Sequence, residues 1–198
     1  MTGVLHYKAG NAPSVLNALR HIGEDGVLIT SAEETERTDR LILPGVGSAG
    51  ATMDSLRELG LDAAIRAMVA RGKPYLGICV GMQLIFDRSE EDDADCLGLL
   101  PGSVKRFNDS SVRVPQIGWN RVSFSRDDPI LKGLREGYFY FVNSYYALPE
   151  LPETVLGTAD YNGAFCAMAG AGNIYGAQFH VEKSSEVGLR ILKNFCAL

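Results

Sequence analysis

A cysteine stands between two glycines where an apolar run changes from a strand-like to a helix-like pattern. Residues 73–86 read KPYLGICVGMQLIF, with Gly77-x-Cys79-x-Gly81 at the centre. Flanking glycines permit a tight turn that lifts a nucleophile above a sheet edge, and the positive end of the following helix stabilises a thiolate. A buried cysteine at a glycine-rich strand end has the same pattern. The motif alone therefore leaves both interpretations open.

A histidine and a glutamate stand much later in the chain, in GAQFHVEKSS (residues 176–185). We expect a strand that carries His180 and Glu182 and gives way to a helix at Ser184 or Ser185. Residues two apart on a strand share a face, so the two side chains should lie side by side. A carboxylate there can hold an imidazole in one tautomer while the other ring nitrogen takes a proton from a thiol. A surface ion pair is the alternative.

Several glycines follow a third hydrophobic segment, LILPGVGSAG (residues 41–50). Glycines at the carboxyl end of a parallel strand let backbone amides point into the crevice where open α/β sheets bind ligands. The segment matches neither GxxxxGK[ST] nor GxGxxG, so a phosphate loop is not indicated, while a plain connecting turn remains the alternative. Together the three segments supply a nucleophile, a base, an orienting carboxylate and oxyanion donors, a combination that favours catalysis.

The elements that position these residues follow from the apolar pattern. Short apolar runs alternate with helical stretches in the first ninety residues, which predicts a parallel sheet with crossover helices. The expected strands are 3–7, 27–30, 40–45 and 74–78, with helices near 15–22 and over 56–70. From about Leu97, short aromatic or β-branched segments predict added antiparallel strands, and 184–195 predicts a last helix. We expect an α/β fold: an open, mostly parallel sheet flanked by helices, flavodoxin-like, with antiparallel strands added in the second half.

The composition and charge of the chain exclude several classes of protein. The chain has 198 residues, 46% of them hydrophobic and 22% charged, which is typical of one globular domain, expected over residues 1–198. The formal net charge is −5 and the basic residues are scattered, so nucleic acid is not expected as a partner. No apolar run approaches the roughly 18 residues of a membrane span, and the residues MTGVLHYKAGN lack the charged n-region and apolar h-region typical of a signal peptide. We expect a cytoplasmic protein without a membrane partner.

Metal and disulfide chemistry is not indicated. The four cysteines, Cys79, Cys96, Cys166 and Cys196, are widely spaced and form no CxxC pair. Such thiols are usually buried and inert, and only Cys79 has a local sequence that argues otherwise. The acidic run SEEDDAD (residues 89–95) predicts a solvated loop. We expect neither a metal nor another cofactor.

The motifs together resemble those of the class I, or triad-type, glutamine amidotransferases, and within them most of all the glutaminase subunits of imidazole glycerol phosphate synthases. The resemblance covers essentially the whole chain. It rests on AGN (9–11), LPGVG (43–47), GICVGMQLIF (77–86), SEE (89–91), LGLLPGSVKRF (97–107), VPQIGWN (114–120), YFYFVNSYY (138–146) and GAQFHVEKSS (176–185).

The resemblance implies hydrolysis of glutamine to glutamate and ammonia through a glutamyl thioester. By position, Cys79 attacks the side-chain amide, His180 shuttles the proton and Glu182 orients His180. The amide of Val80 and the peptide between Val46 and Gly47 would form the oxyanion hole. The residues implied to hold glutamine are Gln83, Ser144 and Tyr145.

The resemblance also implies a heterodimer with a (β/α)8-barrel cyclase subunit. That subunit would use the ammonia to make imidazole glycerol phosphate and AICAR in histidine biosynthesis. The positions that match the partner face are Asn11, Trp119, Tyr140 and Lys183, although Trp119 is equally compatible with a core role.

Three positions depart from the usual pattern of the family. His6 stands where Asp is usual, Asn143 where His is common, and Val181 where Pro is usual. None belongs to the triad. They leave open a paralogous glutaminase that feeds ammonia to another synthase. A stand-alone cysteine hydrolase and a flavodoxin-like binding module with an incidental Cys79 are the remaining alternatives.

Overall fold

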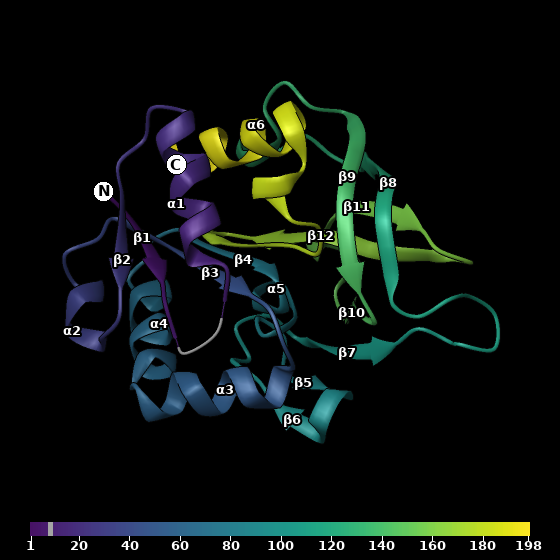
Figure 1. Ribbon diagram of the computed structural model, residues 1–198, viewed down its shortest axis with the longest axis horizontal. Helices are drawn as coiled ribbons and strands as arrows, with labels where there is room; N and C mark the ends of the chain where they lie inside the picture. Colours follow the sequence, from purple (N-terminus) through teal and green to yellow (C-terminus); the bar gives the residue numbers. More distant parts are fainter. Residues whose placement is uncertain (8–9) are drawn as a thin grey trace.

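The computed structural model describes residues 1–7 and 10–198, so Ala9 of the AGN motif lies outside the described residues. Five parallel strands form one side of the sheet (Figure 1). In spatial order they are β2 (Gly26–Ile29), β1 (Thr2–Leu5), β3 (Arg40–Gly45), β4 (Tyr75–Cys79) and β13 (Ile174–Ala177). The four expected N-terminal strands are therefore confirmed. The β4–β13 pair joins segments from the middle and the end of the chain.

Helices cover both faces of this parallel region. In Figure 1, α1 (Ala12–His21) and α6 (Ser185–Cys196) lie above the sheet, and α3 (Ala49–Glu58) and α4 (Leu61–Ala70) lie below it. Each helix turns an apolar stripe inward, as Ile191, Leu192 and Phe195 of α6 illustrate with exposures of 0%. The two other α-helices among the described residues, α2 (Ala32–Thr35) and α5 (Val80–Gln83), are single turns.

The expected helix over 56–70 is wrong in its extent. The structure has two helices there, because Gly60 adopts a left-handed backbone conformation (φ 66°) that ends α3 and starts α4. The first helix also begins earlier than expected, at Ala49, where the Ser48 hydroxyl accepts a hydrogen bond from the Ala51 amide.

The second half adds mostly antiparallel strands, as expected. β12 (Ala164–Ala171) pairs antiparallel with β13, β10 (Tyr145–Pro149) and β11 (Val155–Asp160), and β11 continues into the hairpin of β8 (Gln116–Phe124) and β9 (Glu136–Asn143). Two segments differ from the expectation. β13 joins the parallel region, and β7 (Gly102–Arg106) pairs parallel with the short β5 (Arg88–Ser89). The 3₁₀ turns η2 (Pro129–Leu131) and η3 (Pro152–Thr154) lie in the connections.

The acidic run is more structured than the solvated loop that its charge predicts, although Glu90, Asp92, Asp93 and Asp95 are exposed. It folds into β5, the turn η1 (Glu91–Asp93) and β6 (Ala94–Asp95). The carboxylates of Glu91 and Asp92 accept hydrogen bonds from the backbone amides of Ala49 and Gly50, at 2.9 and 3.2 Å. These amides are at the start of α3, where the helix dipole favours negative charge. The carboxylates of Glu91 and Asp92 therefore cap the N-terminus of α3, although they come from a distant segment of the chain.

No helix among the described residues has both the length and the apolar character needed to cross a bilayer.

Glycines allow β4 to turn directly into α5 (Val80–Gln83). A Cβ on Gly77 would overlap the carbonyl oxygen of Gly81, and a Cβ on Gly81 would overlap that of Leu43 in β3. Backbone atoms cannot move aside as a flexible side chain can. The two glycines of the GxCxG motif are therefore required by close backbone packing around Cys79.

We expect Gly77→Ala to lower the free energy of unfolding by about 3 kcal/mol, since the added methyl group meets backbone in a closely packed core. Chemical denaturation would measure this. Gly137→Ala is the matched control, because its Cβ meets only side-chain atoms, the nearest at 3.1 Å. Equal stability of the two variants would contradict this account of the turn.

Candidate active site

Cys79 occupies a strained position at the carboxyl end of β4. It is the last residue of the strand and the N-cap of α5, with φ 56° and ψ −113°. A residue with a Cβ rarely adopts a positive φ, and such strain costs about 1–3 kcal/mol and clusters at functional sites. The side chain projects from a sharp strand-to-helix turn, the geometry of a nucleophile elbow. This favours the nucleophile over a core role for Cys79, even though the residue is 5% exposed.

His180 and Glu182 lie side by side, although the expected strand is wrong. β13 ends at Ala177, and His180 is the N-cap of a 3₁₀ turn, η4 (Val181–Lys183). The His180 Nδ1 and Glu182 Oε1 atoms are 2.9 Å apart, and the side chains are 6% and 1% exposed. The turn, rather than strand alternation, brings them together. A surface ion pair is thereby excluded.

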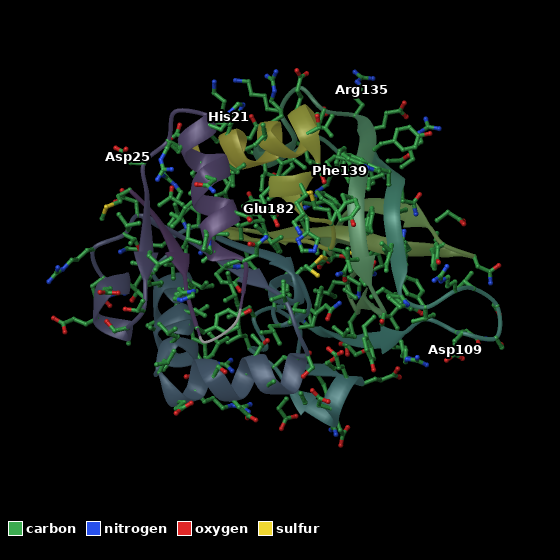
Figure 2. All side chains as sticks on the ribbon, in the orientation of Figure 1. His21, Asp25, Asp109, Arg135, Phe139 and Glu182 are labelled. Atoms are coloured by element: carbon green, nitrogen blue, oxygen red, sulfur yellow. The ribbon has the colours of Figure 1, made fainter. Side chains whose placement is uncertain are left out.

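Backbone and side-chain contacts fix this turn. The His180 amide donates to the Tyr140 carbonyl at 2.9 Å, and the Ser184 hydroxyl donates to the His180 carbonyl at 2.6 Å. The preceding Phe179 packs on Phe139 of β9 with ring centroids 4.1 Å apart. Figure 2 shows Phe139 and Glu182 inside the molecule, whereas His21 lies at the outer end of α1. The backbone of His180 is thus held by hydrogen bonds at its amide and at its carbonyl, and the preceding residue is held by aromatic packing.

The electrostatics of His180 favour the imidazolium. Burial by itself lowers the pKa of His180, but the hydrogen bonds to Cys79 and Glu182 more than offset burial and raise the pKa from 6.5 to about 9. An imidazolium beside a cysteine favours the thiolate, which is the nucleophilic form. Cys79, His180 and Glu182 therefore form one connected hydrogen-bonding network.

A pocket of about 250 Å³ opens over Cys79. Its walls come from the β3–α3 loop, the start of α5, the end of β9 and the start of β10. The expected oxyanion residues Val46, Gly47 and Val80 line it, as do the expected substrate residues Gln83, Ser144 and Tyr145. Eight of the nine residues that the sequence suggested for the triad, the oxyanion hole and substrate binding therefore line one cavity. The ninth, Glu182, does not line it but contacts His180, which does.

The glycine-rich loop is held from beneath by a tyrosine. The Tyr7 hydroxyl donates to the Pro44 carbonyl at 2.8 Å, and burial raises the pKa of Tyr7 to about 12. Gly47 has φ 96°, a conformation that glycine adopts without strain. The loop is therefore shaped as part of the pocket wall, and a plain connecting turn does not describe it.

Sequence reasoning missed a carboxylate in the pocket. Glu91 lines the cavity, and desolvation raises the pKa of its carboxyl group, against the hydrogen bond from Ala49 that lowers it. Because the acidic run was expected to be solvated, nothing in its composition pointed to this residue. The SEE segment of the family resemblance was the only available signal.

The four expected partner-face residues lie on β8, on β9, in η4 and at the start of α1, and both β9 and α1 contact η4. Trp119 on β8 and Tyr140 on β9 are a cross-strand pair with ring centroids 6.0 Å apart. Lys183 ends η4, and Asn11 is the N-cap of α1, which contacts η4. Trp119 is 54% exposed, so the core alternative is wrong for this residue.

The three departures from the family pattern lie in different surroundings. Asn143 is buried, lines the pocket and donates to the Tyr145 carbonyl at 3.0 Å. Val181 is fully buried in η4, and His6 is half-buried at the end of β1. Only Asn143 of the three reaches the cavity, so it is the departure that bears on substrate binding.

No group of three or more His, Cys, Asp or Glu side chains in residues 1–7 and 10–198 is placed to hold a metal ion.

Comparison with known proteins identifies the family. The profile described as "Glutamine amidotransferase class-I" matches residues 6–198. The chain belongs to the class I glutamine amidotransferases. It is therefore an enzyme of the glutaminase type, as its motifs predicted.

Two curated members of the family illustrate the likeness. The chain is 46% identical to "Imidazole glycerol phosphate synthase subunit HisH" of Geobacillus kaustophilus over 100% of this chain and 97% of the relative. It is 43% identical to the protein of the same name from Chlorobaculum tepidum over 98% of both chains.

Solved structures confirm the fold. "Crystal structure of glutamine amidotransferase" has a TM-score of 0.77 at 21% identity and covers 100% of this chain and 99% of that one. "Structure of PurLQS from Thermotoga maritima" has a TM-score of 0.80 at 18% identity, with 99% and 97% covered. The expected α/β architecture is therefore that of class I glutamine amidotransferases.

The geometry of this amidotransferase predicts how Glu182 acts. We expect Glu182→Gln to lower the pKa of His180 from about 9 by roughly one unit or more, because it removes a charged acceptor. An NMR pH titration of the His180 imidazole would measure this. Exposed Glu186→Gln in α6 is the control, and the same pKa in both variants would contradict the proposed orientation of His180 by Glu182.

The same titration has a consequence for stability. The pKa of His180 is higher in the folded chain (about 9) than its ordinary value of 6.5, so the protonated ring stabilises the fold. This contribution is fully present below about pH 6.5 and is lost as the pH rises through 9. Glu182→Gln should therefore flatten the fall in unfolding free energy over that range.

Proposed function

We propose that this chain is the glutaminase subunit of an imidazole glycerol phosphate synthase, acting in the cytoplasm in histidine biosynthesis. It would hydrolyse glutamine and pass the ammonia to a (β/α)8-barrel cyclase subunit, which makes imidazole glycerol phosphate and AICAR. The observation that carries the proposal is the elbow cysteine linked to a buried His180–Glu182 pair in one pocket. The names of the curated relatives supply the pathway.

The proposed chemistry begins at the sulfur. The Cys79 thiolate attacks the side-chain carbonyl carbon of glutamine, and the oxygen takes up the negative charge. Amides of Val80 and of the Val46–Gly47 peptide would donate to that oxygen, since these residues line the pocket. The His180 imidazolium then gives its proton to the departing amide nitrogen. Ammonia leaves and a glutamyl thioester remains on Cys79.

Hydrolysis of the thioester uses the same groups in reverse order. Neutral His180 takes a proton from water, the hydroxide attacks the thioester carbonyl, and glutamate leaves as the thiolate is restored. The Glu182 carboxylate keeps Nδ1 of the ring hydrogen-bonded throughout, at 2.9 Å in this structure. The other ring nitrogen is therefore the one that serves both steps.

The pocket offers complementary groups for an α-amino acid. Gln83, Ser144 and Tyr145 line the wall that would hold the substrate, and Glu91 provides a carboxylate on the same cavity. We assign Glu91 to the α-ammonium group of glutamine, because a partly desolvated carboxylate gains most from a cation. The cavity is smaller than the roughly 300–1,000 Å³ of drug-sized ligand sites, which suits a substrate of this size.

An apolar face supports the proposed partner. Along one side of the β8–β9 hairpin lie Ile117, Trp119, Tyr138 and Val142, exposed by 63, 54, 63 and 37%. Aromatic side chains that stand exposed on a rigid strand pair are typical of protein interfaces. Tyr140 belongs to the same row, and Asn11 and Lys183 would contribute polar contacts beside it.

The first test separates glutaminase from a stand-alone cysteine hydrolase. We expect Cys79→Ala to reduce glutamine hydrolysis at least about 10³-fold, because the thioester can no longer form. Cys166→Ala, which removes a buried thiol far along the chain in β12, should leave hydrolysis unchanged. A diazo-ketone analogue of glutamine should label Cys79 selectively. Full hydrolysis by Cys79→Ala would show that Cys79 is incidental, and no hydrolysis by the unmodified chain would favour a binding module. Labelling with no preference for the glutamine side chain would favour a peptidase.

The second test concerns the partner. We expect Trp119→Ala to weaken binding to the cyclase of the same organism about 30-fold or more, since exposed tryptophans at interface centres contribute about 2 kcal/mol or more. Calorimetry would measure the dissociation constant. Leu151→Ala, at a side chain that is 45% exposed near η3, is the control. Unaltered affinity of Trp119→Ala would place the interface elsewhere, and absence of any binding by the unmodified chain would favour a paralogous partner.

A further inference from the structure

One fully buried polar side chain beside the nucleophile has no role in the chemistry described so far. Gln178 follows β13, is 0% exposed, and has its backbone amide bound to the Ala167 carbonyl at 2.9 Å. Its Nε2 atom lies 3.9 Å from the Cys79 sulfur. Its Oε1 atom accepts a hydrogen bond of 3.1 Å from Gln83 Nε2. Gln178 therefore connects the nucleophile to a residue of the substrate wall.

A backbone carbonyl determines the direction of these hydrogen bonds. Gln83 Nε2 also donates to the Tyr145 carbonyl at 3.1 Å, and a carbonyl can only accept. The NH₂ group of Gln83 must therefore face Tyr145, and its second proton points to Gln178. Gln178 must then present oxygen to Gln83, which leaves its own NH₂ group facing the sulfur. Turning either amide around would place two acceptors or two donors against each other.

The two contacts of the sulfur favour different protonation states. The Cys79 thiol can donate to the Val142 carbonyl at 3.7 Å, an interaction that exists only while the proton is on sulfur. The N–H of Gln178 can donate only to sulfur lone pairs, and it interacts more strongly with a thiolate than with a thiol. His180 and Tyr7 are titratable groups that also interact with Cys79.

We infer that Gln178 is a positioning residue that holds the Gln83 amide in the substrate wall and donates an N–H to the Cys79 thiolate. The inference rests on the proposed function, and it adds a second stabilising partner to the nucleophile besides His180. It also links the state of the sulfur to the orientation of Gln83. A substrate that binds Gln83 is thereby held at a fixed position relative to the Cys79 sulfur, the atom that attacks it in the proposed reaction.

The unmodified protein can test this, because it contains only three glutamines, Gln83, Gln116 and Gln178. With glutamine labelled by ¹⁵N, the side-chain NH₂ resonances of Gln178 should shift with pH at the midpoint at which iodoacetamide alkylation of Cys79 rises. Gln116 is buried at the start of β8 and has no hydrogen bond to Cys79 or Gln83 among the described residues, so its resonances should not follow. In Cys79→Ala, where His180 still titrates, the Gln178 response should disappear. If the side-chain NH₂ resonances of Gln178 do not shift when Cys79 ionises, the inference is overturned.

A variant measures the size of the effect. Gln178→Met keeps the volume but removes the donor, so the alkylation midpoint of Cys79 should rise by about one pH unit. The KM for glutamine should also rise, since Gln83 loses its acceptor. Gln116→Met is the matched control, with an expected midpoint equal to that of the unmodified chain. An unchanged midpoint in folded Gln178→Met contradicts the inference.

Failure of the proposed function has a different signature from failure of this inference. If glutamine is not hydrolysed but the Gln178 resonances still follow Cys79, the substrate assignment is wrong and the positioning role stands. If glutamine is hydrolysed and Gln178→Met retains both the alkylation midpoint and the KM, the positioning role is wrong.

Discussion

The strained backbone of Cys79 is the constraint on which the rest of the structure depends. A residue with φ 56° and ψ −113° is stable only where its surroundings supply the missing free energy. Here β4 pairs with β3 on one side and with β13 on the other, and all five of its residues are buried. The backbone of α5 then presses against Gly77 and Leu43 so closely that no Cβ fits. The two neighbouring strands and α5 thus hold the backbone of Cys79 in place, while its side chain faces the pocket.

The same sheet solves the problem of bringing distant residues to the sulfur. Because β13 lies parallel to β4, both strands end at the same edge, and the residues that follow β13 arrive beside Cys79. Phe179 then packs between Phe139 and Phe141 of β9, with centroid distances of 4.1 and 5.7 Å. Its two neighbours, Gln178 and His180, are thereby presented to the nucleophile. An apolar anchor in the middle of a polar segment fixes the direction of both functional side chains.

Much of this could be predicted from the sequence, and the failures have physical causes. Continuous apolar runs are local signals, so the four N-terminal parallel strands were predicted correctly, whereas the parallel pairing of β13 was not. The glycines around Cys79 are also local and predicted the sharp turn after β4 as one of two interpretations. The break at Gly60 was missed because a helical stripe continues across it. The 3₁₀ turn at His180 was mistaken for a strand, since a residue spacing of two fits both. Glu91 was missed because its partner, the Ala49 amide, lies in a different part of the chain. Hydrogen bonds between segments far apart in the sequence produce no periodic pattern of apolar residues, so they cannot be predicted from such a pattern.

One strand belongs to both the pocket and the apolar face. The outward residues of β9 include Tyr138, Tyr140 and Val142, and its inward residues Phe139 and Phe141 pack in the core. The backbone of the same strand receives the His180 amide at Tyr140 and the Cys79 thiol at Val142. A strand is stiff along its hydrogen-bonded ladder, so its two faces cannot move independently. Any molecule that shifts β9 by binding its outer face must therefore also shift the carbonyl groups that accept from His180 and Cys79.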